Sequence, residues 1–203
     1  MIKATLWDVG GVIFTGPFER FAAYEVEHGL PDGFIRRLNA TNPDSNAWAR
    51  LERSEIGFEE FCALFEDEAR AAGGTLDASE VMALLHGEVR VEMVEAIRRC
   101  RDRGLRTAML TNNVAASSEA PAELAELFDV VVESSRVGFR KPDPRFYQLA
   151  CEQLEIEPPE AVFLDDLGVN LKPARALGMT TIKVTDPATA LLELEQVLGF
   201  ALR

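Results

Sequence analysis

Acidic side chains stand at two points of the sequence where an apolar run ends. Asp8 follows the run that begins at residue 2, and the adjacent pair Asp165 and Asp166 follows the run 162–164. Adjacent carboxylates repel one another, which lowers stability unless a cation balances them. A carboxylate nucleophile near a cation-binding pair of carboxylates is suited to attack on an anionic substrate, as in phosphoryl transfer.

Two further stretches add an anion-binding group and a positive charge. The segment Thr111–Asn113 follows the apolar run 105–110, and a threonine hydroxyl with the backbone N–H groups after it suits an anionic oxygen. Lys141 supplies a cation in a loop after another apolar run. Each stretch alone also fits an ordinary turn, a helix cap or a solvated charge. Their occurrence together, each after an apolar run, favours a reactive site.

Short apolar runs alternate with helical segments over the second half of the chain, which predicts a parallel sheet with right-handed crossovers. We expect strands over residues 2–7, 105–110, 129–133, 161–164 and 180–184. We expect helices over residues 91–103, 117–127 (capped by Ser117 or Ser118), 143–154, 169–177 and 189–198. In open parallel sheets ligands bind outside the carboxyl ends of the strands. The polar residues that follow the strands are therefore expected to lie close together.

Between residues 17 and 86 the strand-like runs vanish and the pattern is helical, with apolar residues spaced by three and four. The expected helices cover residues 18–28, 33–38, 46–53, 58–71 and 78–85. We therefore predict an α/β chain whose core comprises residues 1–16 and 87–203, with a helical cap of residues 17–86 inserted after the first strand. The candidate hinges are residues 14–17 and 86–90, where Gly16 and Gly87 can absorb backbone rotation.

The composition excludes some classes of partner. The chain has 203 residues, with 21 Lys and Arg against 34 Asp and Glu, which gives a net charge of −13. This charge argues against non-specific binding to nucleic acid or to an anionic membrane. No apolar run approaches the ~20 residues of a membrane span. Three widely spaced cysteines without a CxxC pair are expected to be small buried residues in a reducing compartment, so we predict a soluble cytoplasmic protein.

Taken together, these motifs resemble the haloacid dehalogenase superfamily of hydrolases. Within it they resemble the branch that contains the N-terminal phosphatase domain of soluble epoxide hydrolase. The similarity is carried by residues 2–14, 105–113 and 137–184, and in the cap by residues 51–58. The resemblance implies a Rossmann-like parallel sheet flanked by helices, a helical cap and a small phosphorylated substrate. It also implies a monomer or a homodimer.

The resemblance further implies roles for the residues of the phosphate site. Asp8 would attack phosphorus and form an aspartyl-phosphate. Thr111 and the backbone amide of Asn112 would hold the phosphoryl oxygens, while Lys141 would neutralise charge on Asp8 and on the phosphate. Such a site fits the general requirement of phosphoryl transfer for positioning and charge neutralisation.

A Mg²⁺ site is the second implication of the resemblance. Its ligands would be Asp8, the backbone carbonyl of Gly10 and Asp166, with Asp165 supporting the ion through water. Asn170 would help to order the loop that follows the two aspartates. Oxygen ligands of this kind, usually one or two carboxylates together with a substrate phosphate, are those that Mg²⁺ prefers.

Position 10 departs from the pattern of the superfamily. Its phosphatases usually carry a second Asp there, which protonates the leaving group and then activates water. Gly10 has no side chain for either task, although its carbonyl remains available. General acid–base catalysis contributes roughly 10²–10⁴-fold, so alkyl phosphates should suffer more than aryl or acyl phosphates. A simpler interpretation is that Gly10 and Gly11 only make a tight turn.

Three functions remain open at this point. The first is a Mg²⁺-dependent phosphatase with restricted activity. The second is metal-free hydrolysis of a carbon–halogen bond in a 2-haloacid, where halide departs without a proton. The third is a binding or regulatory protein on a disabled hydrolase scaffold. The retained pair Asp165 and Asp166, and the absence at position 10 of the Tyr that dehalogenases often carry, argue against the second.

Overall fold

The chain forms a five-stranded parallel sheet with the strand order β3-β2-β1-β4-β5. The computed structural model describes residues 1–114 and 122–202. The strands are β1 (Ala4–Trp7), β2 (Arg106–Thr111), β3 (Val130–Glu133), β4 (Ala161–Asp165) and β5 (Thr180–Lys183). All five strands predicted from the sequence are present in this one sheet, and the predicted α/β class is confirmed.

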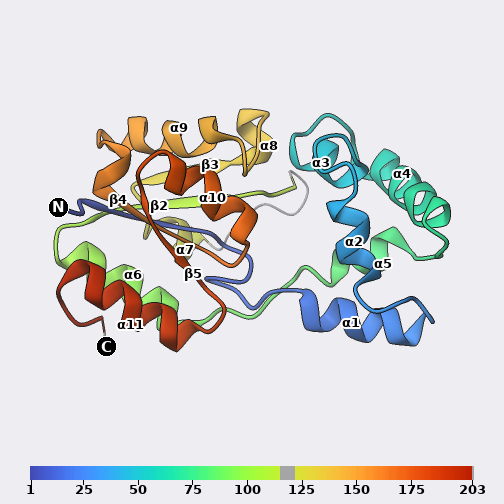
Figure 1. Cartoon of the computed structure of the whole chain (residues 1–203), viewed down its shortest axis with the longest axis horizontal. Coiled ribbons are helices and arrows are strands. Elements are labelled where there is room, and N and C mark those ends of the chain that lie inside the picture. The colour runs from blue at the N-terminus through green and yellow to red at the C-terminus, as the bar shows by residue number, and fades with distance from the viewer. Residues whose placement is uncertain (115–121, 203) are drawn as a thin grey trace.

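Helices cover both faces of the sheet (Figure 1). One face carries α6 (Val91–Asp102), α7 (Ala122–Ala125) and α11 (Pro187–Leu198), and the other carries α9 (Pro144–Leu154) and α10 (Gly168–Ala176). Successive side chains of a strand point to opposite faces. In β4, Val162 and Leu164 therefore pack toward α6 and α11, while Phe163 packs toward α9 and α10. Burial on both faces explains why this strand is a continuous apolar run.

The helices of the second half agree with the sequence prediction to within two residues at their ends, except in one segment. The predicted helix 117–127 and its cap at Ser117 or Ser118 fall largely outside the described residues, and only α7 is described there. Two short elements were not predicted, namely α8 (Ser134–Val137) and a 3₁₀ turn over Pro158–Glu160. Neither is long enough to show a helical period in the sequence.

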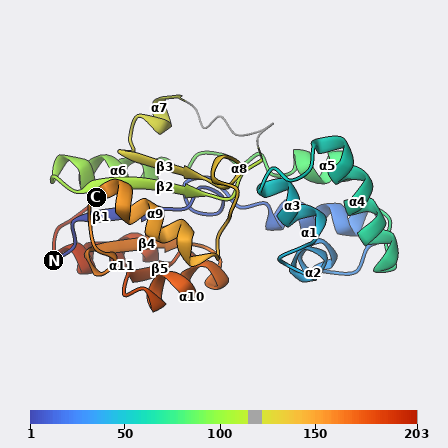
Figure 2. The same ribbon diagram turned by 90° about the horizontal axis from the view of Figure 1, so that it is seen from above.

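The remaining five helices form a separate group beside the carboxyl ends of the strands (Figures 1 and 2). They are α1 (Phe18–Glu27), α2 (Phe34–Ala40), α3 (Ala47–Glu52), α4 (Phe58–Ala71) and α5 (Ala78–Ala83), and we call them the helical module. The module has its own apolar cluster, in which Phe61 and Phe65 stack with their ring centroids 5.2 Å apart. Val114 also packs in this cluster, so the chain that leaves β2 contacts the module.

Two segments of chain run side by side between the sheet and the module. The backbone N–H of Thr15 donates to the Glu88 carbonyl at 2.9 Å, and that of Arg90 donates to the Ile13 carbonyl at 2.8 Å. Gly87 lies so close to the other segment that an added Cβ would stand 2.3 Å from the Thr15 carbonyl oxygen. This close pairing therefore requires glycine at position 87.

Two further sequence predictions concern the cysteines and the membrane. Cys100 and Cys151 are buried as predicted, whereas Cys62 is half-buried, with its Sγ 3.7 Å from the Ser79 hydroxyl. Within the part of the chain that the structure describes, every helix is too short or too polar to cross a membrane.

We expect Gly87→Ala to destabilise the protein, because the new methyl group collides with backbone that cannot move aside as a side chain can. Overpacking of this kind costs roughly 1–3 kcal/mol, which corresponds to a fall in Tm of roughly 2–12 °C for a chain of this size. Thermal unfolding measures the effect. The matched control is Gly57→Ala, where an added Cβ meets nothing within 4 Å. Equal Tm values for both variants would contradict the close contact.

Candidate active site

The register of the sheet places Asp8 beside the carboxyl ends of both neighbouring strands. Trp7, the last residue of β1, pairs with Met109 of β2 and with Leu164 of β4. The backbone N–H of Asp8 donates to the Leu164 carbonyl at 2.9 Å. Asp8 therefore lies next to Asp165, the last residue of β4, in the arrangement expected for a parallel sheet.

The ammonium group of Lys141 joins the ends of three strands. Its Nζ lies 2.7 Å from Asp8 Oδ1, 2.8 Å from Asp165 Oδ2 and 3.0 Å from the Leu110 carbonyl oxygen. Burial alone acts to lower the pKa of Lys141, but the charges of Asp165 and Asp8 outweigh it and raise the pKa above its usual value. The lysine is therefore charged, and each of its three N–H donors has an acceptor.

Asp165 is fully buried and both of its oxygens are engaged. Oδ1 accepts from the backbone N–H of Leu167 at 2.8 Å, and Oδ2 accepts from Lys141. The side-chain amide of Asn170 donates to both oxygens at 3.1 Å. The Tyr147 hydroxyl donates to the backbone carbonyl of Asn170 at 2.7 Å, which holds that residue in place. The carboxylate of Asp165 is therefore fixed in one orientation, between the lysine and the first turn of α10.

Asp166 faces a different environment. It is half-buried, and its carboxylate lies against Gly11, where an added Cβ would stand 2.3 Å from Asp166 Oδ2. Gly11 also has a φ of +78°, in the left-handed region that favours glycine. One oxygen each of Asp8, Asp165 and Asp166 lies within 4.8 Å of the others. This set of hard oxygen donors fits a Mg²⁺ ion.

The charges of the cluster also favour a divalent cation. Three carboxylates and one ammonium group leave two negative charges in excess when all are ionised. Burial, followed by the charge of Asp165, raises the pKa of Asp166 to about 6. Burial also raises the pKa of Asp8, with Lys141 opposing the shift and the other two aspartates adding to it. The protein alone therefore does not balance the charge of these carboxylates.

Thr111 and Asn112 follow one another at the end of β2, and both are half-buried. The Asn112 side chain makes two hydrogen bonds to the backbone of Lys141. Its Nδ2 donates to the Lys141 carbonyl at 3.0 Å, and its Oδ1 accepts from the Lys141 N–H at 2.9 Å. The sequence predicted a role for the backbone amide of Asn112 alone. The side-chain contact with Lys141 was missed because nothing in the sequence links residues 29 positions apart.

Gly10 lies in the turn that follows β1. The N–H groups of Ile13 and Phe14 both donate to the Val9 carbonyl, at 3.0 and 2.9 Å. An added Cβ at Gly10 meets nothing within 4 Å, and φ at this residue is outside the left-handed region. The backbone would therefore accept a side chain at position 10.

The helical module contributes one residue that sequence reasoning did not include. Glu52, at the end of α3, forms an ion pair with Arg140, the residue before Lys141. Its other carboxylate oxygen accepts a hydrogen bond from Trp48 Nε1 at 3.1 Å. Burial raises the pKa of Glu52, and Arg140 opposes that shift. Glu52 and Arg140 lie in the segments 51–58 and 137–184, both of which the sequence analysis named. The two residues are 88 positions apart, so the sequence did not indicate that they pair.

The sequence matches that of known hydrolases over most of its length. The profile of the haloacid dehalogenase-like hydrolases matches residues 2–178. Mouse acyl-CoA dehydrogenase family member 10 is 41% identical over 98% of this chain, and pig bifunctional epoxide hydrolase 2 is 34% identical over 99% of it. The chain spans only 19% and 40% of those two proteins. The sesquiterpene phosphatase astK of Aspergillus oryzae is 28% identical, over 97% of both chains.

Solved structures of the same fold include proteins with different described ligands. A HAD-like family hydrolase from Porphyromonas gingivalis matches with a TM-score of 0.70 and 22% identity over 98% of both chains. A HAD family enzyme from Bacteroides thetaiotaomicron, in complex with magnesium and inorganic phosphate, matches at 0.62 with 19% identity over 90% and 94%. An L-2-haloacid dehalogenase from Xanthobacter autotrophicus, with chloropropionic acid covalently bound, matches at 0.63 with 20% identity over 98% and 84%. At these identities the likeness shows the fold alone.

If the acidic cluster binds Mg²⁺, the effect of the ion on stability should depend on pH. A carboxyl whose pKa is raised in the folded state holds its proton more tightly there than in the unfolded chain. For Asp166, stability of the metal-free protein therefore falls as the pH rises between 3.8 and about 6. Because Mg²⁺ binds the ionised carboxylates, we expect it to raise Tm more at pH 7.5 than at pH 5.

Thermal unfolding with and without Mg²⁺ at both pH values measures this effect. At 100 times its Kd the ion stabilises by about 2.7 kcal/mol, or roughly 5–10 °C in Tm for a chain of this size. Asp166→Asn should be more stable than the natural protein without metal at pH 7.5, and should lose most of the Mg²⁺ effect. An equal Mg²⁺ shift at both pH values would rule out the carboxylate cluster as its cause.

Proposed function

Because the chain belongs to the haloacid dehalogenase-like hydrolases, we propose that it is a Mg²⁺-dependent phosphatase of a small phosphorylated metabolite. The observation that carries this proposal is the cluster of Asp8, Asp165 and Asp166 around Lys141 at the carboxyl ends of the strands. A carboxylate nucleophile next to a fixed cation supplies what phosphoryl transfer needs, namely positioning and charge neutralisation. The similarity to a named phosphatase over nearly the whole chain supports the same reaction class.

In the first half-reaction, one oxygen of Asp8 forms a bond to phosphorus while the bond from phosphorus to the leaving oxygen breaks. Lys141 holds Asp8 Oδ1, which orients the carboxylate and neutralises charge that the phosphate brings into the site. The Thr111 hydroxyl and the Asn112 N–H bind the phosphoryl oxygens. These groups act where negative charge is largest, next to the buried Asp8 and Lys141, and electrostatic interactions are strong in such surroundings.

Asp8, Asp166 and the carbonyl of Gly10 would hold Mg²⁺, which would supply positive charge to the phosphate. Asp165 already has both oxygens engaged by Lys141, Leu167 and Asn170. Its contribution to the metal site is therefore to fix Lys141 and to support the ion through water.

Gly10 leaves the reaction without a proton donor or acceptor at position 10. The leaving oxygen receives no proton from this residue, and the water that attacks the aspartyl-phosphate finds no base there. Leaving groups that are stable as anions, such as phenolates and carboxylates, tolerate this loss better than alkoxides. The preferred substrates are therefore aryl or acyl phosphates.

We assign the helical module as a cap over this site. Residues 17–86 would form the cap, and residues 1–16 and 87–203 the hydrolase core. The module lies beside the carboxyl ends of the strands (Figure 2), and the paired segments at Thr15 and Glu88 are where it would pivot. A cap of this kind excludes water and selects substrates. A cytoplasmic location and a monomeric or homodimeric state remain predictions.

We expect Asp8→Asn to lower phosphate release from p-nitrophenyl phosphate by about 10³-fold or more, because the amide cannot act as the nucleophile. Chelation of Mg²⁺ should have a similar effect. The control is Asp67→Asn, which removes an exposed carboxylate on α4 far from the cluster. Unchanged turnover in Asp8→Asn or after chelation would refute the proposal, and chloride release from 2-chloropropionate without Mg²⁺ would identify a dehalogenase instead.

We expect Gly10→Asp to fold, because an added Cβ at this position meets nothing within 4 Å, and to raise turnover of alkyl phosphates. The gain should approach the ~10²-fold lower bound of general acid catalysis, and it should be much smaller for aryl phosphates. Phosphate release from matched alkyl and aryl substrates measures the ratio. Equal gains on both substrates would show that Asp at position 10 acts other than by protonating the leaving group.

A further inference from the structure

Helix α3 of the helical module contacts the loop of Lys141 through a desolvated ion pair. The exposed fractions of the Arg140 and Glu52 side chains are 19% and 11%. The hydrogen bond from Trp48 Nε1 orients the Glu52 carboxylate from within the same helix. An ion pair removed from water in this way leaves an uncompensated charge if either partner is lost.

Arg140 also touches the backbone of the next residue. Its Nε donates to the Lys141 carbonyl at 3.2 Å, the same oxygen that the Asn112 amide binds at 3.0 Å. The side-chain Nζ of Lys141 in turn forms the ion pair with Asp8. A continuous chain of polar contacts therefore runs from Glu52 in the module, through Arg140 and Lys141, to the nucleophile.

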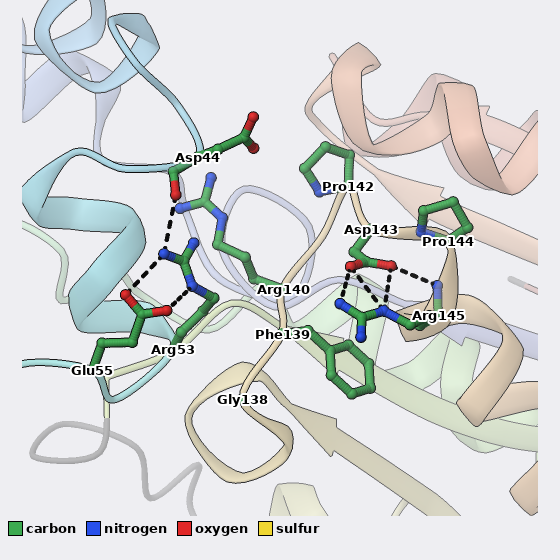
Figure 3. Close-up of a pocket in the computed structure, with 10 residues that line it drawn as sticks. All are labelled: Asp44, Arg53, Glu55, Gly138, Phe139, Arg140, Pro142, Asp143, Pro144 and Arg145. Carbon is green, nitrogen blue, oxygen red and sulfur yellow. Dashed lines mark hydrogen bonds and ion pairs between the residues drawn. The ribbon is translucent and has the colours of Figure 1, made fainter.

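Figure 3 shows that Arg140 stands in a groove between the module and the loop of residues 138–145. The groove has a volume of about 580 Å³. Two other arginines line it, but each is paired with a carboxylate on its own side: Arg53 with Glu55 at 2.6 Å and Arg145 with Asp143 at 2.5 Å. The groove therefore does not form a second anion site. Of these three arginines, Arg140 is the one whose ion pair crosses from one side to the other.

We propose that Glu52 is a positioning residue for Lys141, acting through Arg140. The Glu52 carboxylate holds the guanidinium group against the Lys141 carbonyl, so the loop of Lys141 is fully fixed only while the helical module lies against the core. Closure of the module and alignment of the catalytic cation are then a single event. This inference rests on the proposed phosphatase function, because it assigns Glu52 a part in that reaction.

The test is the effect of Glu52→Gln and Arg140→Lys on kcat and KM with Mg²⁺, on p-nitrophenyl phosphate and on acetyl phosphate. Because small displacements of a catalytic group cost up to 10²-fold, we expect kcat to fall by about 10-fold or more for both variants. The fall should be equal on both substrates, and KM should change by less than about 2-fold. Arg140→Lys keeps a positive charge for Glu52 but removes the Nε donor to Lys141.

The matched controls are Glu55→Gln and Arg145→Gln, which break the two other ion pairs of the groove. Neither should change kcat. A rise in KM at unchanged kcat, a loss confined to the larger substrate, or full activity of Arg140→Lys would overturn the positioning role. Each of these results would mean that Glu52 and Arg140 serve substrate binding or packing alone.

The two proposals fail in different ways. If the natural protein releases no phosphate from either substrate, the phosphatase proposal fails, and the link from Glu52 to Lys141 is then decided by Trp48 fluorescence. We expect Asn112→Ala, which frees the Lys141 backbone, to shift the emission of Trp48 at the other end of the chain of contacts. Trp48→Phe identifies the signal, and Arg145→Gln is the control. An unchanged emission in Asn112→Ala would overturn the inference.

Discussion

Burying an ammonium group costs several kcal/mol unless charges and hydrogen bonds replace its water, and Lys141 meets three such acceptors at the ends of three adjacent strands. The acceptors are available only because the register of the sheet aligns Asp8 with Leu110 and Asp165. The lysine in turn separates two carboxylates that would otherwise repel one another. Loss of this cation would therefore disturb Asp8, the strand ends and the loop at Asn112 together.

The two adjacent aspartates have different surroundings for a geometric reason. Neighbouring side chains at the end of a strand point in different directions, so Asp165 turns into the protein and Asp166 turns toward Gly11. Asp165 has protein donors on both oxygens and is suited to orienting Lys141. Asp166 has a raised pKa because burial, and then the charge of Asp165, disfavour its ionised form.

Sequence patterns predicted the strands and the cluster of charged side chains at their ends because both follow from local rules. Apolar runs buried on two faces identify the strands, and the parallel topology brings their carboxyl ends together. The partners of individual side chains do not follow from such rules. Asn112 binds the Lys141 backbone and Glu52 binds Arg140 across 29 and 88 positions, and these contacts depend on how loops and the helical module pack. Helix α8 was missed because four residues show no period.

The pair Gly10 and Gly11 contains two glycines with different physical explanations. Gly11 adopts a left-handed φ and leaves room for the Asp166 carboxylate, so the fold itself excludes a larger residue. Gly10 meets neither condition, because its φ lies outside the left-handed region and an added Cβ would contact nothing within 4 Å. A tight turn therefore explains Gly11 and does not explain Gly10. The backbone therefore imposes glycine at position 11 and does not impose it at position 10.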